Sequence, residues 1–254
     1  MLQPAIVLTG APVWAEAIAD KLGSDYRLAR YSDRFNYVER LADDHAAFII
    51  VDGDHEDWQG WVTSPKVHNA TRRIPVLLIS DEADIRSAAL LSGADMTFTA
   101  AEAIRQIKRL VQDFARIVSP QTIERLEGAC REPLPPLVVQ GIEHFNAGEF
   151  YRQHDLLEEQ WMATDGPIRD LYRAILQVGV AYYQITRGNG RGAKKMLLRS
   201  VQWLSILPDV CQGVDVRGLR EDSYRVRAEL ERLGEGDIAA FDQSLLKPVK
   251  RVDE

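Results

Sequence analysis

The sequence contains little cysteine, and its two cysteines stand far apart. Cys130 and Cys211 are the only ones among 254 residues, they form no CxxC pair, and neither lies beside a histidine. Because thiolate zinc sites usually need three or four ligands close together, this spacing argues against zinc bound by cysteine. We therefore interpret both as isolated thiols with packing roles, which is typical of a reducing compartment.

Long apolar runs and a leader segment are also missing. The first residues, MLQPAIVLTGAPVW, have no basic region followed by a long apolar stretch, so they do not resemble a signal peptide. No apolar run approaches the roughly 20 residues that span a bilayer. These absences predict a cytoplasmic protein without a membrane partner.

The sequence also lacks an overall basic character. Its formal net charge is −7, whereas general nucleic-acid binders usually carry a strongly basic face. We therefore expect no nucleic-acid partner. One basic cluster does surround the turn at 188–190, where a helix N-terminus could attract a small anion; it comprises Arg187, Arg191, Lys194, Lys195 and Arg199.

Short apolar runs alternate with helical patterns over residues 1–118. The expected strands are 5–8, 47–51, 76–79 and 95–98, and the expected helices are 14–22, 84–92 and 101–118. Continuous apolar strands separated by helices indicate a parallel sheet that is covered on both faces. The first domain is therefore predicted to be a doubly wound α/β domain.

The pattern changes after residue 118. Residues 119–136 contain three prolines near their end and are predicted to be a linker with one helical turn at 123–126. Residues 137–254 show no strand pattern, and short connections between helices imply antiparallel neighbours in an all-α bundle. The expected helices are 137–147, 149–163, 168–187, 191–207, 219–233 and a short one near 238–246.

The first domain resembles response-regulator receiver domains (the CheY-like, flavodoxin-like fold). The resemblance rests on the order of its elements and on the strings IIVDGD, PVLLIS and GADMTFT. It implies that Asp52 occupies the position of the phosphoacceptor aspartate that ends the third strand. Ser80 then matches the hydroxyl residue that ends the fourth strand.

The departures from that family concern its chemistry. Thr9-Gly10-Ala11 stands where receivers carry an acidic pair for Mg²⁺, and Ala100 stands where they carry a lysine. Phosphoryl transfer relies on a metal and a cation to neutralise developing charge. We therefore interpret Asp52 as an exposed, vestigial phosphoacceptor in a pseudo-receiver. Such a domain is expected to dock to the helical domain, to a protein partner, or to a second copy in a dimer.

The second domain holds the best site candidates. Phe150, His154, Leu157 and Trp161 follow the spacing of a stripe that a helix buries, which predicts a core-facing His154. Glu158 follows one turn later, where an i,i+4 pair can touch. A carboxylate there would raise the pKa of the histidine, and the two side chains are the expected ligands of any divalent metal.

The following helix is apolar nearly all round. Its amides, Gln177 and Gln184, share a narrow stripe with Asp170 and Arg173. A buried amide without a partner costs about 1–3 kcal/mol, so these groups need partners. We predict that the stripe faces His154 and Glu158 in a polar pocket for a small anion or metabolite. Its expected walls are Trp161, Tyr151, Tyr182 and Tyr183.

The string FNAGEFYRQHDLLEEQW, followed by QVGVAYY and RGNGRGA, resembles the uncharacterised DUF309 family over about residues 140–207. The family implies a helical bundle and no established activity. Its members often carry a histidine where this chain has Gln184, which weakens a two-histidine metal site. The family's hallmark positions are His154, Glu158, Trp161, Gln177, Asn189 and Gly192.

Three interpretations of the His154/Glu158 pair remain open. The pair can be a structural element that fixes how helices dock, part of a ligand-binding or sensory site, or part of a metal-assisted or acid–base enzyme such as a hydrolase. HExxH and a serine nucleophile elbow are absent from the sequence. The sequence therefore favours a regulatory or ligand-binding protein of signal transduction over an enzyme.

Overall fold

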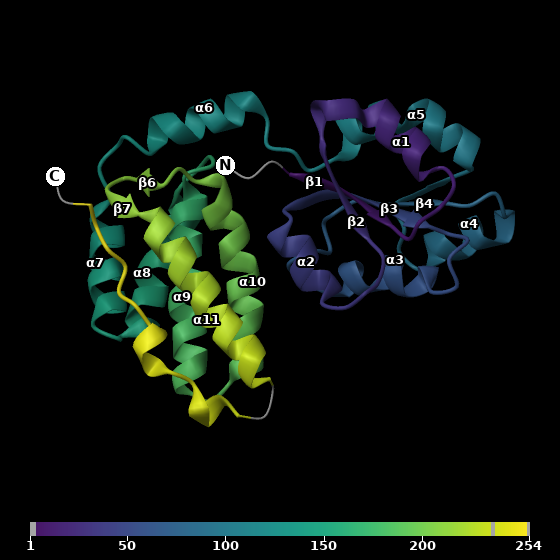
Figure 1. Ribbon diagram of the computed structural model, residues 1–254. Coiled ribbons are helices and arrows are strands. Elements are labelled where there is room, and N and C mark those ends of the chain that lie inside the picture. The colour runs from purple at the N-terminus through teal and green to yellow at the C-terminus, as the bar shows by residue number, and fades with distance from the viewer. Residues whose placement is uncertain (1–3, 235–236, 253–254) are drawn as a thin grey trace. The chain divides into compact units, whose positions relative to one another are not determined.

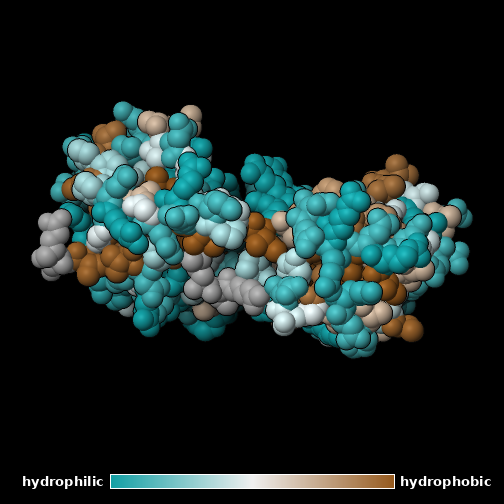
Figure 2. Space-filling model, turned by 90° about the horizontal axis from the view of Figure 1, so that it is seen from above, coloured by the Kyte–Doolittle hydropathy of each residue, from teal (hydrophilic) through white to brown (hydrophobic). Residues whose placement is uncertain are grey.

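The computed structural model describes residues 4–234 and 237–252. The chain divides into two compact units, one ending at Ile117 and the other beginning at Val118 (Figure 1). In neither part of the described chain is a helix long and apolar enough to cross a membrane. Hydrophilic residues predominate on the face seen in Figure 2, where hydrophobic residues gather in separate patches.

A five-stranded parallel sheet forms the middle of the first unit. The strand order is β2-β1-β3-β4-β5, which is the flavodoxin-like order of a doubly wound fold. All residues of β1, β3 and β4 are buried, because helices cover both faces of the sheet. The strands are β1 (Ala5–Thr9), β2 (Arg27–Tyr31), β3 (Ala46–Asp52), β4 (Val76–Ile79) and β5 (Met96–Phe98).

Each face of this sheet has its own apolar core. Ile18 of α1 and Ile107 of α5 pack on one face, and Trp61 of α3 and Ala89 of α4 pack on the other. The predicted doubly wound α/β domain is thereby confirmed. The helices are α1 (Ala15–Leu22), α2 (Tyr37–Asp43), α3 (Trp58–Val67), α4 (Ala83–Leu91) and α5 (Ala100–Phe114).

The second unit is largely helical, as predicted. Helix α9 lies at its centre: ten of its 18 residues are buried, and it packs against both α8 and α10. Two short 3₁₀ turns, at 238–240 and 243–245, lie near the end of the chain. The helices are α6 (Pro120–Ala129), α7 (Pro136–Asn146), α8 (Phe150–Ala163), α9 (Arg169–Thr186), α10 (Gly190–Ile206) and α11 (Val216–Leu233).

A small β-hairpin corrects the expectation that the second unit has no strand. β6 (Val210–Cys211) pairs antiparallel with β7 (Val214–Asp215). The last described residues extend this hairpin, since Val214 bridges to Arg251 and the Val252 amide donates to the Gly213 carbonyl at 2.7 Å. Backbone pairing with a distant segment explains why so short a strand forms.

A disulfide between Cys130 and Cys211 shows that the interpretation as two isolated thiols is wrong. The two Cα atoms are 4.4 Å apart although 81 positions separate the residues in sequence. The Gln212 amide donates to the Cys130 carbonyl at 2.7 Å, and the Tyr172 hydroxyl donates to the Gln212 side chain at 2.9 Å. These bonds hold the end of α6 beside the hairpin, which brings the sulfurs together.

The segment expected to be a linker is part of the helical unit. It contains the ten-residue helix α6, which begins at Pro120 after the capping residue Ser119. Leu126 of this helix is buried in the core of the bundle. The disulfide at its end then joins α6 covalently to the rest of the unit.

Candidate functional site

The buried face of α8 lies one residue away from the face that the spacing predicts. Gln153 is 0% exposed, whereas the His154 side chain is 35% exposed, so the prediction of a core-facing His154 is wrong. A Cβ on Gly179 would lie only 1.9 Å from the Gln153 Oε1 atom. The missing side chain at Gly179 therefore makes the space that admits Gln153 into the core.

His154 and Glu158 form a loose pair at the edge of the bundle. The His154 Nδ1 atom lies 4.0 Å from Glu158 Oε2 and 3.3 Å from Asp155 Oδ1. The longer distance exceeds that of a hydrogen bond. The Glu158 side chain is 48% exposed, so this pair is open to solvent instead of forming a buried hydrogen-bonded lock.

Arginine and tryptophan side chains alternate where α8, α9 and α10 meet. The Arg173 guanidinium lies 3.8 Å from the ring centroid of Trp203 on α10 and 5.8 Å from that of Trp161 on α8. Arg169 lies 5.4 Å from the same Trp161 ring. These distances are typical of cation–π contacts. We call Trp161, Arg169, Arg173 and Trp203 the arginine–tryptophan cluster.

One carboxylate accompanies this cluster. The Arg173 Nη2 atom donates to Asp170 Oδ1 at 2.5 Å. Burial raises the pKa of the Asp170 carboxyl, and the neighbouring Arg173 and Arg169 partly offset that rise. Asp170 therefore lies in a partly desolvated place where its charge is stabilised by the two arginines.

Several polar atoms of this region are buried without a hydrogen-bond partner among the residues that the structure describes. They are the indole Nε1 of Trp161, the Nε of Arg169 and the Oε1 of Gln177. Buried polar groups in folded proteins are nearly always paired, by protein groups or by ordered water. The cluster thus has hydrogen-bonding capacity that its own side chains do not use.

Gln184 and Asn189 have a different partner from the one predicted. The Asn189 Nδ2 atom donates to Gln184 Oε1 at 2.8 Å, and Asn189 Oδ1 accepts from the Gly192 amide at 2.9 Å, which caps α10. A Cβ on Gly192 would lie 2.6 Å from the Asn189 amide nitrogen. This trio shapes the turn between α9 and α10.

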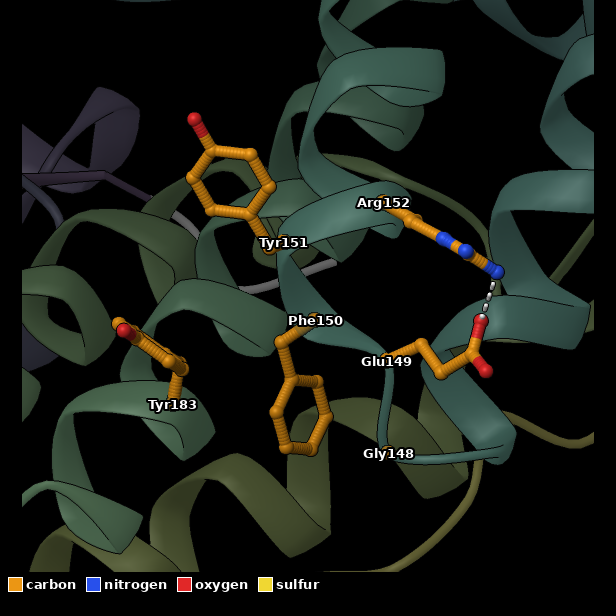
Figure 3. A pocket seen from close by; sticks show the side chains of 6 residues that line it. All are labelled: Gly148, Glu149, Phe150, Tyr151, Arg152 and Tyr183. Atoms are coloured by element: carbon orange, nitrogen blue, oxygen red, sulfur yellow. Dashed lines mark hydrogen bonds and ion pairs between the residues drawn. The ribbon is translucent and has the colours of Figure 1, made fainter.

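A pocket of about 410 Å³ lies where α8 begins, beside Tyr183 of α9 (Figure 3). Phe150 and Tyr151 point away from each other there, and Arg152 bonds Glu149 at 3.2 Å. Tyr151 and Tyr183, two of the predicted walls, line this pocket. Tyr182 does not: it is buried and packs with Phe145 and Phe150 in the core.

These contacts align α8 with α9 at two points. Tyr151 and Tyr183 both line the pocket, and the Arg173 guanidinium lies 5.8 Å from the Trp161 ring centroid, so the two helices run antiparallel. Between these two points the helical period puts His154 and Glu158 on α8, and Val180 and Gln177 on α9. We call these exposed and half-exposed side chains the seam: Tyr151, His154, Glu158 and Trp161 on α8, and Tyr183, Val180, Gln177, Arg173 and Arg169 on α9.

Asp52 of the first unit is more buried than predicted. It is 8% exposed, which corrects its interpretation as an exposed residue. Gly10, at φ +72°, lies against it: a Cβ there would be 3.1 Å from Asp52 Oδ2. Burial raises the pKa of the Asp52 carboxyl. Ser80 donates to Asp54 at 2.7 Å and not to Asp52.

The ion pairs in the described part of the first unit do not involve the Asp52 region. Within the described residues, no lysine or arginine forms an ion pair with Asp52 or Asp54. Nor do three or more His, Cys, Asp or Glu side chains converge on a metal-sized space anywhere in residues 4–234 and 237–252. His154 and Glu158 thus remain a two-residue pair.

Comparison with known proteins finds similarity to the DUF309 family in the second unit. Residues 138–196 match the family described as "Domain of unknown function (DUF309)". A curated relative, an uncharacterised protein of Aquifex aeolicus (strain VF5), is 26% identical over 99 residues. That match covers 39% of this chain and 29% of the relative, so the chain spans less than a third of the relative's length.

Solved receiver structures match the first unit. A candidate response regulator from Chloroflexus aurantiacus J-10-fl is 16% identical at a TM-score of 0.37, over 43% of this chain and 99% of that one. The receiver domain of a signal transduction histidine kinase from Syntrophus aciditrophicus is 22% identical at 0.36, over 46% and 96%. The receiver-like fold itself rests on the strand order β2-β1-β3-β4-β5.

Proposed function

We propose that this is a regulatory protein whose DUF309 unit binds a small ligand along the seam. The observation that carries the proposal is the group of buried polar atoms without partners at Trp161, Arg169 and Gln177. Leaving such atoms unpaired costs about 1–3 kcal/mol each, and a ligand that pairs them recovers that cost. His154 and Glu158, partly exposed on the same seam, would contact the remainder of the ligand.

The receiver-like unit is proposed to act without phosphoryl transfer. Its aspartate, Asp52, is nearly buried, and Ala100 stands at the position that the receiver family fills with lysine. Without metal-binding carboxylates or that cation, charge developing on a transferred phosphoryl group would not be neutralised. The unit would instead dock to a protein partner or to a second copy, and so couple ligand binding to assembly.

The binding proposal is tested by thermal unfolding of the full chain with a panel of metabolites. Gln177→Leu replaces the amide by an apolar group of similar size. The free variant should unfold at the same temperature as the wild type or higher, because an unsatisfied amide is removed. Its affinity for any ligand that stabilises the wild type should fall at least tenfold.

Glu159→Ala is the matched control, since Glu159 is exposed on the same helix and lies outside the seam. It should bind as the wild type does. If no compound raises the unfolding temperature, or if Gln177→Leu binds with unchanged affinity, the seam is not a ligand site.

The receiver part is tested separately with acetyl phosphate and Mg²⁺, followed by intact-mass measurement. We expect no added phosphoryl group on the wild-type chain. A mass increase that disappears in Asp52→Asn would contradict the proposed role.

A further inference from the structure

We propose that the ligand of the seam carries an oxyanion, a carboxylate or phosphate group, and that Arg169 and the Trp161 indole N–H bind it. Arg173 supplies a second positive charge beside them. This inference rests on the proposed binding function and adds the chemical class of the ligand. It follows from three properties of the arginine–tryptophan cluster: its charge, the kind of atoms left without partners, and the contacts that hold its guanidinium groups.

The charge of the cluster opposes that of the chain. Arg169 and Arg173 lie on adjacent turns of α9, and Arg199 of α10 lies 5.4 Å from the Trp203 ring. Asp170 is the carboxylate bonded within this group. Arg169, Arg173 and Asp170 together carry a net charge of +1, whereas the chain as a whole carries −7. Such a place attracts anions and repels cations.

The unpaired atoms select the same kind of ligand. An indole Nε1–H and a guanidinium Nε–H can only donate hydrogen bonds. The partner of Trp161 Nε1 and of Arg169 Nε must therefore be an acceptor, as the oxygens of a carboxylate or phosphate are. Gln177 adds an amide that can turn either its oxygen or its nitrogen toward a ligand.

Neighbouring side chains already hold the guanidinium groups of the cluster. Arg173 stacks on Trp203 at 3.8 Å, and its Nη2 atom is held by Asp170 at 2.5 Å. The Arg169 guanidinium lies 5.4 Å from the centroid of the Trp161 ring. Stacked guanidinium groups lose little further side-chain freedom on binding, so more of the interaction energy appears as affinity.

The indole rings of the cluster have two separate roles, packing and hydrogen bonding. Two indoles provide faces for the guanidinium groups, while one of them also provides a donor. Replacing Trp161 by phenylalanine keeps an aromatic face and removes only the N–H. That substitution therefore separates packing from hydrogen bonding at this position.

The experiment compares citrate and inorganic phosphate with sodium chloride at equal ionic strength, on the full chain. The readouts are the thermal unfolding temperature and tryptophan fluorescence, to which Trp161 and Trp203 contribute. We expect a saturable stabilisation by citrate, by phosphate or by both, and none by chloride. The more effective of the two anions shows whether the bound group is a carboxylate or a phosphate.

Two variants and one control decide whether the cluster is the site. Arg169→Gln and Trp161→Phe should each weaken the effective anion at least tenfold. Arg225→Gln removes a guanidinium that is exposed on α11, where Arg225 bonds Asp222, and should leave binding unchanged. An equal loss in all three variants would mean general screening of charge and would overturn the inference.

The outcomes distinguish this inference from the proposed function. If neutral metabolites stabilise the wild type through Gln177 and neither anion does, the seam binds ligands but the oxyanion class is wrong. If neither neutral compounds nor anions bind, both proposals are wrong. Anion binding that survives in Arg169→Gln and in Trp161→Phe would place the anion elsewhere and reject the assigned site.

Discussion

The disulfide offers the most quantitative prediction. Cys130 and Cys211 are 81 positions apart, so their bond closes a loop that includes α7, α8, α9 and α10. In the chain-entropy model, closing such a loop lowers the conformational entropy of the unfolded chain by about 15 cal/mol/K. This loss raises the free energy of the unfolded chain by about 4.5 kcal/mol at 25 °C. The double variant Cys130→Ala/Cys211→Ala should therefore lower the free energy of unfolding of the helical unit by about 2–5 kcal/mol.

The measurement is urea unfolding followed by far-ultraviolet circular dichroism. Reduction of the wild type with dithiothreitol should shift its midpoint toward that of the double variant. The same reductant should have no effect on the double variant, which serves as its own control. Thiol titration of the unfolded, unreduced wild type should find no free cysteine, since Cys130 and Cys211 are the only two.

Two results would refute this reasoning. A loss below about 1 kcal/mol, with the disulfide intact in the wild type, would mean that the unfolded chain is already constrained without the bond. Two titratable thiols in protein purified without reductant would mean that the bond does not form. In that case Cys211 would act as the small buried side chain that the sequence analysis predicted.

Two further predictions concern Asp52 and Asn189. Because burial raises the pKa of the Asp52 carboxyl, the folded first unit binds its proton more tightly than the unfolded chain does. The free energy of unfolding should therefore fall as the pH rises through the range in which Asp52 ionises. Asp52→Asn should abolish that part of the pH dependence, measured by urea unfolding at a series of pH values. If stability fell more steeply with rising pH in the variant than in the wild type, the fold would instead stabilise the ionised form of Asp52. Asn189→Ala removes the cap of α10 and should cost about 0.5–2 kcal/mol in chemical denaturation. An unchanged midpoint there would mean that the turn holds without its side-chain bonds.

The sheet of the first unit was predictable where strands are buried and was missed at one of its two edges, at β2. Strands β1, β3 and β4 are buried along their whole length and therefore appear as continuous apolar runs. Strand β2, with the sequence RLARY, pairs with β1 alone among the described strands and is partly exposed. An edge strand needs no apolar run, so its sequence carries little of the signal that identified the others.

Two helices of the first unit were missed for local reasons. Helix α2 has only seven residues and follows Asn36, whose φ is +47°. Helix α3 contains Gly60 and Pro65, both of which lower helix propensity. Their apolar faces contain Tyr37 and Trp61, which pack edge to face 4.7 Å apart. Tertiary contact between aromatic rings stabilises these helices beyond what their local sequence indicates.

At the candidate site, too, the sequence pattern identified the helix, whereas a contact with another helix determined which side chain is buried. The apolar stripe of α8 correctly identified a helix that packs in the bundle, and it drew attention to His154, Glu158 and Trp161. It did not determine which of two neighbouring polar residues enters the core. That choice depends on Gly179, which belongs to another helix and offers space only to Gln153.

The same dependence on contacts explains why the sequence analysis did not single out Arg169. An arginine in the first turn of a helix is ordinary, and only its position over the Trp161 ring distinguishes it from other surface cations. Its sequence neighbour Asp170 bonds Arg173, one turn later, and not Arg169. The donors left over at Arg169 and Trp161 therefore depend on how α9 packs against α8. A ligand able to accept from both donors would complete hydrogen bonds that the described parts of α8, α9 and α10 leave open, and this makes Arg169 the most informative single substitution in the helical unit.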